Sequence, residues 1–98
     1  MKDGWFVGNF SPTAFSTNLF EVCYKTHQKG ELWDTHYHEF STEINLLISG
    51  KMTINGIELN AGDIFTIEPY YIAAPIFLED CTLIIIKTPS IPGDKKII

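Results

Sequence analysis

Short stretches of the chain alternate between apolar and polar residues, and turn-forming residues separate these stretches. Residues 19–26 place Phe20, Val22 and Tyr24 on one side of an expected strand, because successive side chains of a strand point to opposite faces. No window of helical length has apolar residues at the spacing of an amphipathic helix. The pattern predicts an all-β protein built from short strands.

Further strands are expected wherever turn signals bound an apolar or alternating run. They cover residues 32–40, 43–48, 51–54, 57–59, 64–67, 71–78 and 81–88. Ser49-Gly50 and Asn55-Gly56 each predict a tight two-residue hairpin, because glycine adopts the positive φ that such turns require. Turns at this frequency are typical of a β-sandwich or a β-barrel.

The run from Leu83 to Ile86 is continuously apolar, so we expect its strand to be covered on both faces. The core would cover one face, and a second copy of the chain or a neighbouring segment would cover the other. At 98 residues the chain forms one domain with a modest core, which favours a dimer. We therefore expect a homodimer that Ile85→Lys weakens, with Ile84→Lys as the control.

The single domain, residues 1–98, divides into an N-terminal arm or strand at 1–17, a barrel core at 18–88 and a C-terminal tail at 89–98. The net charge of −5 and the scattered lysines argue against nucleic acid or an anionic membrane as a partner. No apolar run is long enough for a membrane-spanning helix. Cys23 and Cys81 lack CxxC spacing and no secretory signal is evident, so we expect a reduced, cytoplasmic protein.

Candidate chemistry is concentrated in one short segment. His36 and His38 lie two residues apart, so a strand would project both imidazoles from the same face. Glu43 follows after a candidate turn at Ser41-Thr42 and can return its carboxylate to that face. Two imidazoles and a carboxylate are ligands for zinc, iron, nickel or manganese, and the residue types leave the choice among these metals open.

The spacing G-x5-H-x-H-x4-E-x6-G, from Gly30 to Gly50, resembles the first conserved motif of the cupins. Gly62-Asp63 and the residues up to Pro69 resemble the start of the second cupin motif, so the resemblance covers roughly residues 30–88. It implies a double-stranded β-helix, or jelly-roll barrel, with a divalent metal in its mouth. In such a barrel His36, His38 and Glu43 would be ligands, together with a histidine from the second motif.

The second motif departs from the family pattern. That pattern requires proline at 68, glycine at 70 and histidine at 73, whereas this chain has Glu68, Tyr70 and Ala73. Three protein ligands leave either an open position for water and substrate or a site too weak to keep its metal, and both outcomes stay open. Glu68 and Asp34 are the nearest candidate replacements, although neither occupies a ligand position of the family.

Aromatic residues supply the remaining site candidates. Tyr70 and Tyr71 stand at the start of an expected strand, where a phenol would narrow the mouth or donate a hydrogen bond to a ligand. Trp33 either lines a pocket or packs in the core. The chain has no GxSxG or phosphate-binding glycine loop, and we assign no catalytic residue and no chemistry to the cysteines.

These observations predict a small stand-alone cupin that binds a small molecule in the barrel mouth, with a divalent metal on His36, His38 and Glu43. One alternative is a metal-dependent enzyme of the dioxygenase or isomerase type, acting on a small polar substrate. The other alternative is a metal-free structural domain whose role is dimerisation. The missing histidine favours binding over catalysis.

Overall fold

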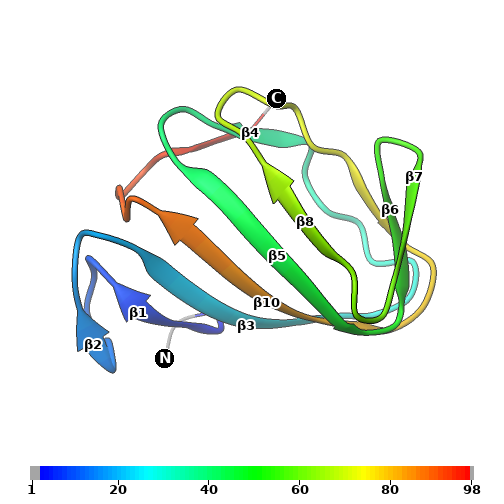
Figure 1. The fold of residues 1–98 in the computed structure, drawn as a ribbon, viewed down its shortest axis with the longest axis horizontal. Helices are drawn as coiled ribbons and strands as arrows, with labels where there is room; N and C mark the ends of the chain where they lie inside the picture. The colour runs from blue at the N-terminus through cyan, green and yellow to red at the C-terminus, as the bar shows by residue number, and fades with distance from the viewer. Residues whose placement is uncertain (1–2, 98) are drawn as a thin grey trace.

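The computed structural model describes residues 3–97, and within that range it contains eleven strands and no helix (Figure 1). The strands are β1 (Trp5–Gly8), β2 (Phe15–Ser16), β3 (Glu21–His27), β4 (His36–His38), β5 (Thr42–Ser49), β6 (Lys51–Ile54), β7 (Ile57–Asn60), β8 (Ile64–Ile67), β9 (Pro75–Phe77), β10 (Cys81–Thr88) and β11 (Lys95–Ile97). A helix able to cross a membrane is accordingly absent from residues 3–97. The all-β prediction is confirmed.

The strands form two facing walls. One wall is a six-stranded sheet in the order β2-β1-β3-β10-β5-β8, and Figure 1 shows β3, β10, β5 and β8 side by side in it. The other wall combines the sheets β7-β6-β9 and β11-β4. A single bridge between His36 and Ala73 links β4 to the segment that precedes β9. The histidine strand therefore belongs to the wall that faces the large sheet.

Alternation along β3 and β10 sorts their side chains between the interior and the outer face. Ile85 of β10 lines an internal cavity and packs against the core, whereas Ile84 lies across from Tyr24 of β3 and Leu46 of β5 on the outer face. The assignment of the dimer test residues was therefore wrong, and Ile84 is the outward one. Among the described residues, the outward positions on β3, β10, β5 and β8 are all uncharged: Val22, Tyr24, Thr26, Thr42, Ile44, Leu46, Ile48, Ile64, Thr66, Thr82, Ile84, Ile86 and Thr88.

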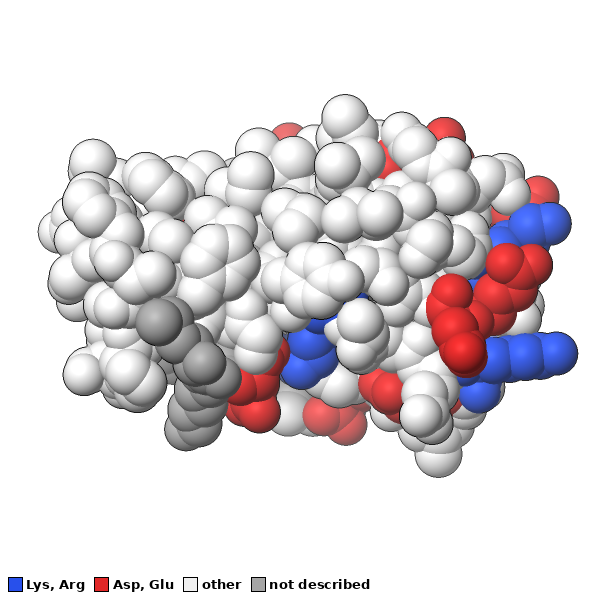
Figure 2. Space-filling model, turned by 90° about the horizontal axis from the view of Figure 1, so that it is seen from below, with Lys and Arg blue, Asp and Glu red and all other residues white. Residues whose placement is uncertain are grey.

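Charged side chains are unevenly distributed over the surface. Seen from below, uncharged side chains cover most of the molecule, and charged ones gather towards one end (Figure 2). Near the middle of this view a basic group is set back in a hollow between uncharged side chains, with acidic groups beside it (Figure 2). Some of the charged groups therefore lie in a hollow rather than on the outermost surface.

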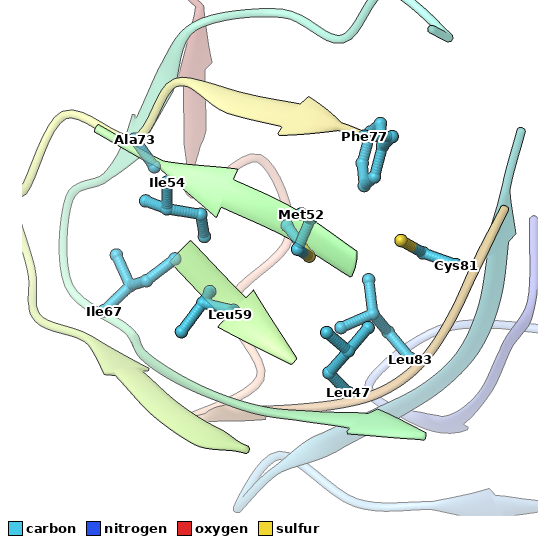
Figure 3. Close-up of a cluster of buried hydrophobic side chains, with 9 residues drawn as sticks. All are labelled: Leu47, Met52, Ile54, Leu59, Ile67, Ala73, Phe77, Cys81 and Leu83. Atoms are coloured by element: carbon cyan, nitrogen blue, oxygen red, sulfur yellow. The ribbon is translucent and has the colours of Figure 1, made fainter. Parts of the chain in front are cut away.

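The core lies between the walls, and its side chains point into the space that the strands enclose (Figure 3). Leu47 of β5 and Met52 of β6 are its most buried large members, at 0% and 2% exposure. Burying one such side chain contributes about 1.5–3 kcal/mol. The whole cluster comprises Leu47, Met52, Ile54, Leu59, Ile67, Ala73, Phe77, Cys81 and Leu83.

Of the two predicted hairpins, one is confirmed and one is wrong. Asn55 and Gly56 both have positive φ, 51° and 83°, and join the paired strands β6 and β7. Ser49-Gly50 joins no pair, because β5 pairs with β10 and β8 whereas β6 pairs with β7 and β9. Gly50 (φ 94°) instead carries the chain from one wall to the other, so close to β10 that a Cβ would lie 2.2 Å from the backbone oxygen of Asp80.

The expected strand at residues 32–40 is reduced to His36–His38, because no described strand pairs with residues 32–35. Leu32 accordingly stands 94% exposed. β4 is completed from elsewhere in the chain, since β11 pairs with it and sets Lys95 opposite His38. The predicted C-terminal tail thus contains a strand, and the predicted N-terminal arm contains β1, which pairs with β3.

Candidate metal centre

His36, His38 and Glu43 lie together inside the barrel. They are 7%, 3% and 9% exposed, and each offers one ligand atom such that these atoms all lie within 4.8 Å of one another. The two histidines share a face because they alternate along β4. Glu43 reaches them from β5, after the bend at residues 39–41. The structure therefore brings together the three residues that the spacing singled out.

His36 is prepared to act as a metal ligand. Its Nδ1 lies 2.9 Å from the backbone oxygen of Asp34, and a carbonyl oxygen only accepts, so Nδ1 carries the proton. This tautomer leaves the lone pair on Nε2. Burial lowers the pKa of His36, and the hydrogen bond to Asp34 opposes this shift only in part, so the neutral form of the imidazole is favoured.

His38 and Glu43 form a buried pair. The Nε2 atom of His38 donates to Oε2 of Glu43 at 2.6 Å. Burial alone would raise the pKa of Glu43, but this hydrogen bond and the nearby imidazoles outweigh it and hold the pKa below its ordinary value. A carboxylate beside two imidazoles is a donor set that divalent metals accept, and a bound metal would replace the proton that the pair now shares.

One atom of the centre is buried without a hydrogen-bond partner. Among residues 3–97 the Nδ1 atom of His38 finds none, and the acidic oxygen nearest to it there is Oδ2 of Asp94 at 4.0 Å. Metal-bound imidazoles commonly direct their second nitrogen at a carboxylate, which fixes the tautomer and supports the ligand. With a metal on Nε2, the proton of His38 would move to Nδ1 and face Asp94. The unsatisfied nitrogen is therefore consistent with a metal centre whose supporting acid is already in place.

Asp94 also organises the bend between the two ligand strands. Its side chain is fully buried and accepts hydrogen bonds from the backbone N–H groups of Phe40 at 2.8 Å and Ser41 at 3.0 Å. Because the bend joins β4 to β5, one carboxylate holds both halves of the centre in place. The sequence offered no signal for this role, since Asp94 lies more than fifty positions from the residues it binds.

The centre lines a cavity of about 290 Å³. Core residues such as Met52 and Phe77 form an apolar part of its wall, and Trp33 lines it too, which answers the question that the sequence left open. The cavity also exposes charged side chains that the sequence analysis did not select: Glu21, Lys25, Lys87 and Lys95. Alternation placed Glu21 and Lys25 on the same face of β3 as Cys23, but it did not indicate that this face points into the barrel.

Position 73, where the family pattern requires a histidine, lies beside the centre. Ala73 is 1% exposed, lines the cavity and exchanges two backbone hydrogen bonds with His36, of 2.8 and 3.2 Å. Its methyl group donates nothing to a metal. Glu68 and Asp34 are exposed and lie outside the ligand group, so neither replaces the missing histidine among the described residues.

Tyr70 and Tyr71 lie outside the cavity lining, with 62% and 42% exposure. The ring of Tyr70 stacks on Tyr37 at 5.9 Å, and its backbone N–H donates to the oxygen of His38 at 2.8 Å. Tyr70 thus helps to position β4 through its backbone. Contact between these two phenols and a ligand stays a prediction.

Both cysteines are buried free thiols. Burial raises the pKa of Cys23 to about 11 and also raises that of Cys81, so both are protonated at neutral pH. Neither belongs to the ligand group. This agrees with the absence of any assigned cysteine chemistry.

No protein-family model matches the chain, and no curated protein matches it. Solved structures do. A conserved protein with a double-stranded β-helix domain from Klebsiella pneumoniae is 24% identical, with a TM-score of 0.74 over 83% of this chain and 71% of that one. Pac13 from Streptomyces, described as a nucleoside dehydratase, is 14% identical, with a TM-score of 0.72 over 84% and 70%.

A cupin-2 domain protein from Shewanella frigidimarina is 17% identical, with a TM-score of 0.57 over 74% of this chain and 72% of that one. At these identities the likeness shows the fold. The protein has a double-stranded β-helix fold, as the spacing of the first motif implied.

Proposed function

We propose that this protein binds a small molecule in the mouth of its barrel, beside a divalent metal ion held by His36, His38 and Glu43. The observation that carries the proposal is the convergence of three buried ligand atoms, within 4.8 Å of one another, on the wall of a cavity of about 290 Å³. A cavity of that size suits a sugar or a small acid rather than a polymer.

The donor set supports this assignment chemically. Two imidazoles and one carboxylate leave coordination positions open to water or to an oxygen atom of the ligand. A metal bound there would polarise a carbonyl or hydroxyl oxygen. Because Ala73 has no donor atom, position 73 supplies no fourth protein ligand, and its small side chain lines the cavity next to His36.

The enzyme alternative rests on one specific observation, the likeness in fold to Pac13, which is described as a nucleoside dehydratase. In a metal-dependent reaction on a small polar substrate, the hydrogen-bonded pair of His38 and Glu43 would be the candidate proton carrier. Nothing else among residues 3–97 favours a chemical reaction over binding. Binding therefore stands as the principal proposal.

We also propose that the protein is a homodimer joined through the outer face of the six-stranded sheet. That face presents Ile44, Leu46, Ile84 and Ile86, and its outward positions are uncharged along β3, β10, β5 and β8. A two-fold dimer brings identical patches together, so an uncharged patch avoids burying like charges.

Metal content and thermal stability test the metal site. Protein purified without a histidine tag is analysed for metals, and melting temperatures are recorded with zinc, iron(II), nickel and manganese. We expect at least one of these ions to raise the melting temperature of the wild type, because a ligand specific to the native state stabilises it. His36→Ala and Glu43→Gln should abolish the rise. His27→Asn is the matched control, because His27 is buried yet lies outside the ligand group.

A proton count provides a second readout. With a metal on Nε2 the proton of His38 would move to Nδ1, so binding to the neutral pair should release no proton, whereas a protonated imidazole must lose one before it can bind a metal. Binding should therefore weaken as the pH falls. Calorimetric titration in two buffers of different ionisation enthalpy, at neutral and at acidic pH, measures the number of protons released. Metal below roughly a tenth of an equivalent, together with no stabilisation by any of the four ions, contradicts the proposal.

A further inference from the structure

The cavity is basic although the protein is acidic. The chain carries a net charge of −5, yet the cavity lining contains Lys25, Lys87 and Lys95 against only Glu21 and Glu43. A divalent metal at the centre would add to this positive charge. The lining therefore favours a negatively charged ligand.

The two glutamates of the lining are already engaged. Glu21 forms a buried ion pair with Lys87, with Oε1 3.1 Å from Nζ, and Glu43 accepts the hydrogen bond of His38. Among residues 3–97, no carboxylate lies within ion-pair distance of Lys25 or Lys95. Two ammonium groups of the mouth thus lack an internal counterion in the described part of the chain.

Both of these ammonium groups lie over the ring of Trp33. The Nζ atom of Lys25 lies 5.2 Å from the centre of the Trp33 ring, and that of Lys95 lies 4.8 Å from it. Lys25 comes from β3 and Lys95 from β11, so opposite walls of the barrel supply the two cations. An indole face attracts cations but does not neutralise them.

This arrangement is costly for the protein alone. Burial lowers the pKa of Lys95; the carboxylates of Asp34 and Glu43 oppose this shift, and the neighbouring Lys25 and Lys87 add to it. Like charges that lie close together in a partly desolvated cavity raise the free energy of the protein, and a bound anion would lower it. Charged groups held in this way in a cleft are candidates for a functional site.

We propose that the ligand of the barrel mouth is a small organic anion, whose carboxylate or phosphate oxygens bind Lys25 and Lys95 and whose carbon skeleton lies against Trp33. This inference rests on the mouth being the ligand site, as proposed above, and names the class of ligand. Carboxylate and phosphate share the required chemistry, an anionic oxygen group that accepts hydrogen bonds from two ammonium groups.

The test uses three probes of similar size: benzoate, phenyl phosphate and the neutral benzamide. The chain has two tryptophans, so Trp5→Phe leaves the fluorescence of Trp33 as the readout. We expect millimolar benzoate or phenyl phosphate to change this fluorescence saturably and benzamide to have no effect. Added salt should weaken the binding, because the contact is ionic. The stronger of the two anions identifies the favoured oxygen group.

Lysine variants locate the site. Lys25→Met and Lys95→Met keep most of the side-chain length and remove the charge, and each should weaken anion binding by about tenfold. Lys96→Met is the matched control, because Lys96 is adjacent on β11 but pairs with Glu39 at 3.7 Å and does not line the cavity. The proposal is overturned if benzamide binds as well as benzoate, if Lys96→Met acts like Lys95→Met, or if neither anion binds at millimolar concentration.

Metal titrations on the same proteins separate this inference from the metal site. Lysine-dependent benzoate binding in a protein that zinc, iron, nickel and manganese do not stabilise would refute the metal centre and support the anion site. Stabilisation by a metal ion without any anion binding would support the metal centre and refute the anion site. Retained metal stabilisation in Lys25→Met and Lys95→Met, with weaker benzoate binding, supports both.

Discussion

Replacing Asp94 should destabilise the fold and loosen the candidate metal centre together. Its fully buried carboxylate accepts the backbone N–H groups of Phe40 and Ser41, at 2.8 and 3.0 Å. In Asp94→Ala both N–H groups lose their partner, and in Asp94→Asn one amide oxygen remains while the amide nitrogen faces a donor. No metal ligand is altered in either variant.

The magnitude follows from these two bonds. A hydrogen bond to a charged group contributes about 1.5–3 kcal/mol, so Asp94→Ala, which loses two, should lower the free energy of unfolding by about 3–6 kcal/mol. Asp94→Asn should lower it by about 2 kcal/mol. For a domain of this length, the alanine variant would then melt at least about 10 °C below the wild type. Because total stabilities are about 5–15 kcal/mol, Asp94→Asn should still fold and keeps the prediction measurable if Asp94→Ala does not.

Urea unfolding followed by circular dichroism measures these differences, and Asp63→Ala is the control. Asp63 also accepts a backbone N–H, that of Asn60 at 2.8 Å, but it is exposed, so its loss should cost less than about 1 kcal/mol. If Asp94→Ala costs no more than Asp63→Ala, the bend is held by something other than this carboxylate. The stabilisation by metal ions should also be smaller in Asp94→Asn, since the bend sets the distance between the ligand strands.

Three further expectations follow from the structure. Burial alone would raise the pKa of Asp94, but its backbone hydrogen bonds hold that pKa below the ordinary 3.8. The carboxylate therefore contributes its full stabilisation above pH 3.8, and this contribution is lost as the pH falls from 3.8 through the lower pKa of the folded state. The difference in unfolding free energy between the wild type and Asp94→Asn should shrink over that range. Gly50→Ala should cost more than about 2 kcal/mol in urea unfolding, because its Cβ would meet a backbone oxygen at 2.2 Å, and Gly56→Ala, with open space around it, should cost about 1 kcal/mol. Ile84→Lys should convert the proposed dimer to a monomer in light scattering without unfolding it, whereas Ile85→Lys should unfold the chain; a wild type that is itself monomeric refutes the dimer.

The parts of the fold that alternation and local spacing encode were predictable. β3 follows a period of two, so the sequence separates its two faces, but alternation alone does not reveal that the face with Val22 and Tyr24 lies outward. His36 and His38 are neighbours in one strand, and Glu43 follows after a short bend, so their convergence is a local property. The wrong choice of Ile85 for the dimer test came from a run that is apolar on both faces and therefore carries no period.

Long-range pairing was not predictable. The dipeptide Ser49-Gly50 indicates where the chain turns but not which sheet the next strand joins, so a crossing between walls was mistaken for a hairpin. The roles of Asp94 and Lys95 depend on β11 pairing with β4, and no local pattern encodes a partner that distant. The cationic part of the mouth was therefore recognised only once the strands were in place.

The three-residue strand β4 also constrains the order in which the barrel assembles. Its partners are Ala73 on one edge and β11 on the other, and contacts so distant in sequence form only after large loops have closed. Core residues that are close in sequence, such as Leu47 and Met52, need only short loops to approach each other, whereas the final spacing of the imidazoles depends on the distant partners of β4. We therefore expect metal ions to bind a finished barrel rather than to nucleate it, so chelators present during refolding should leave the folding rate unchanged.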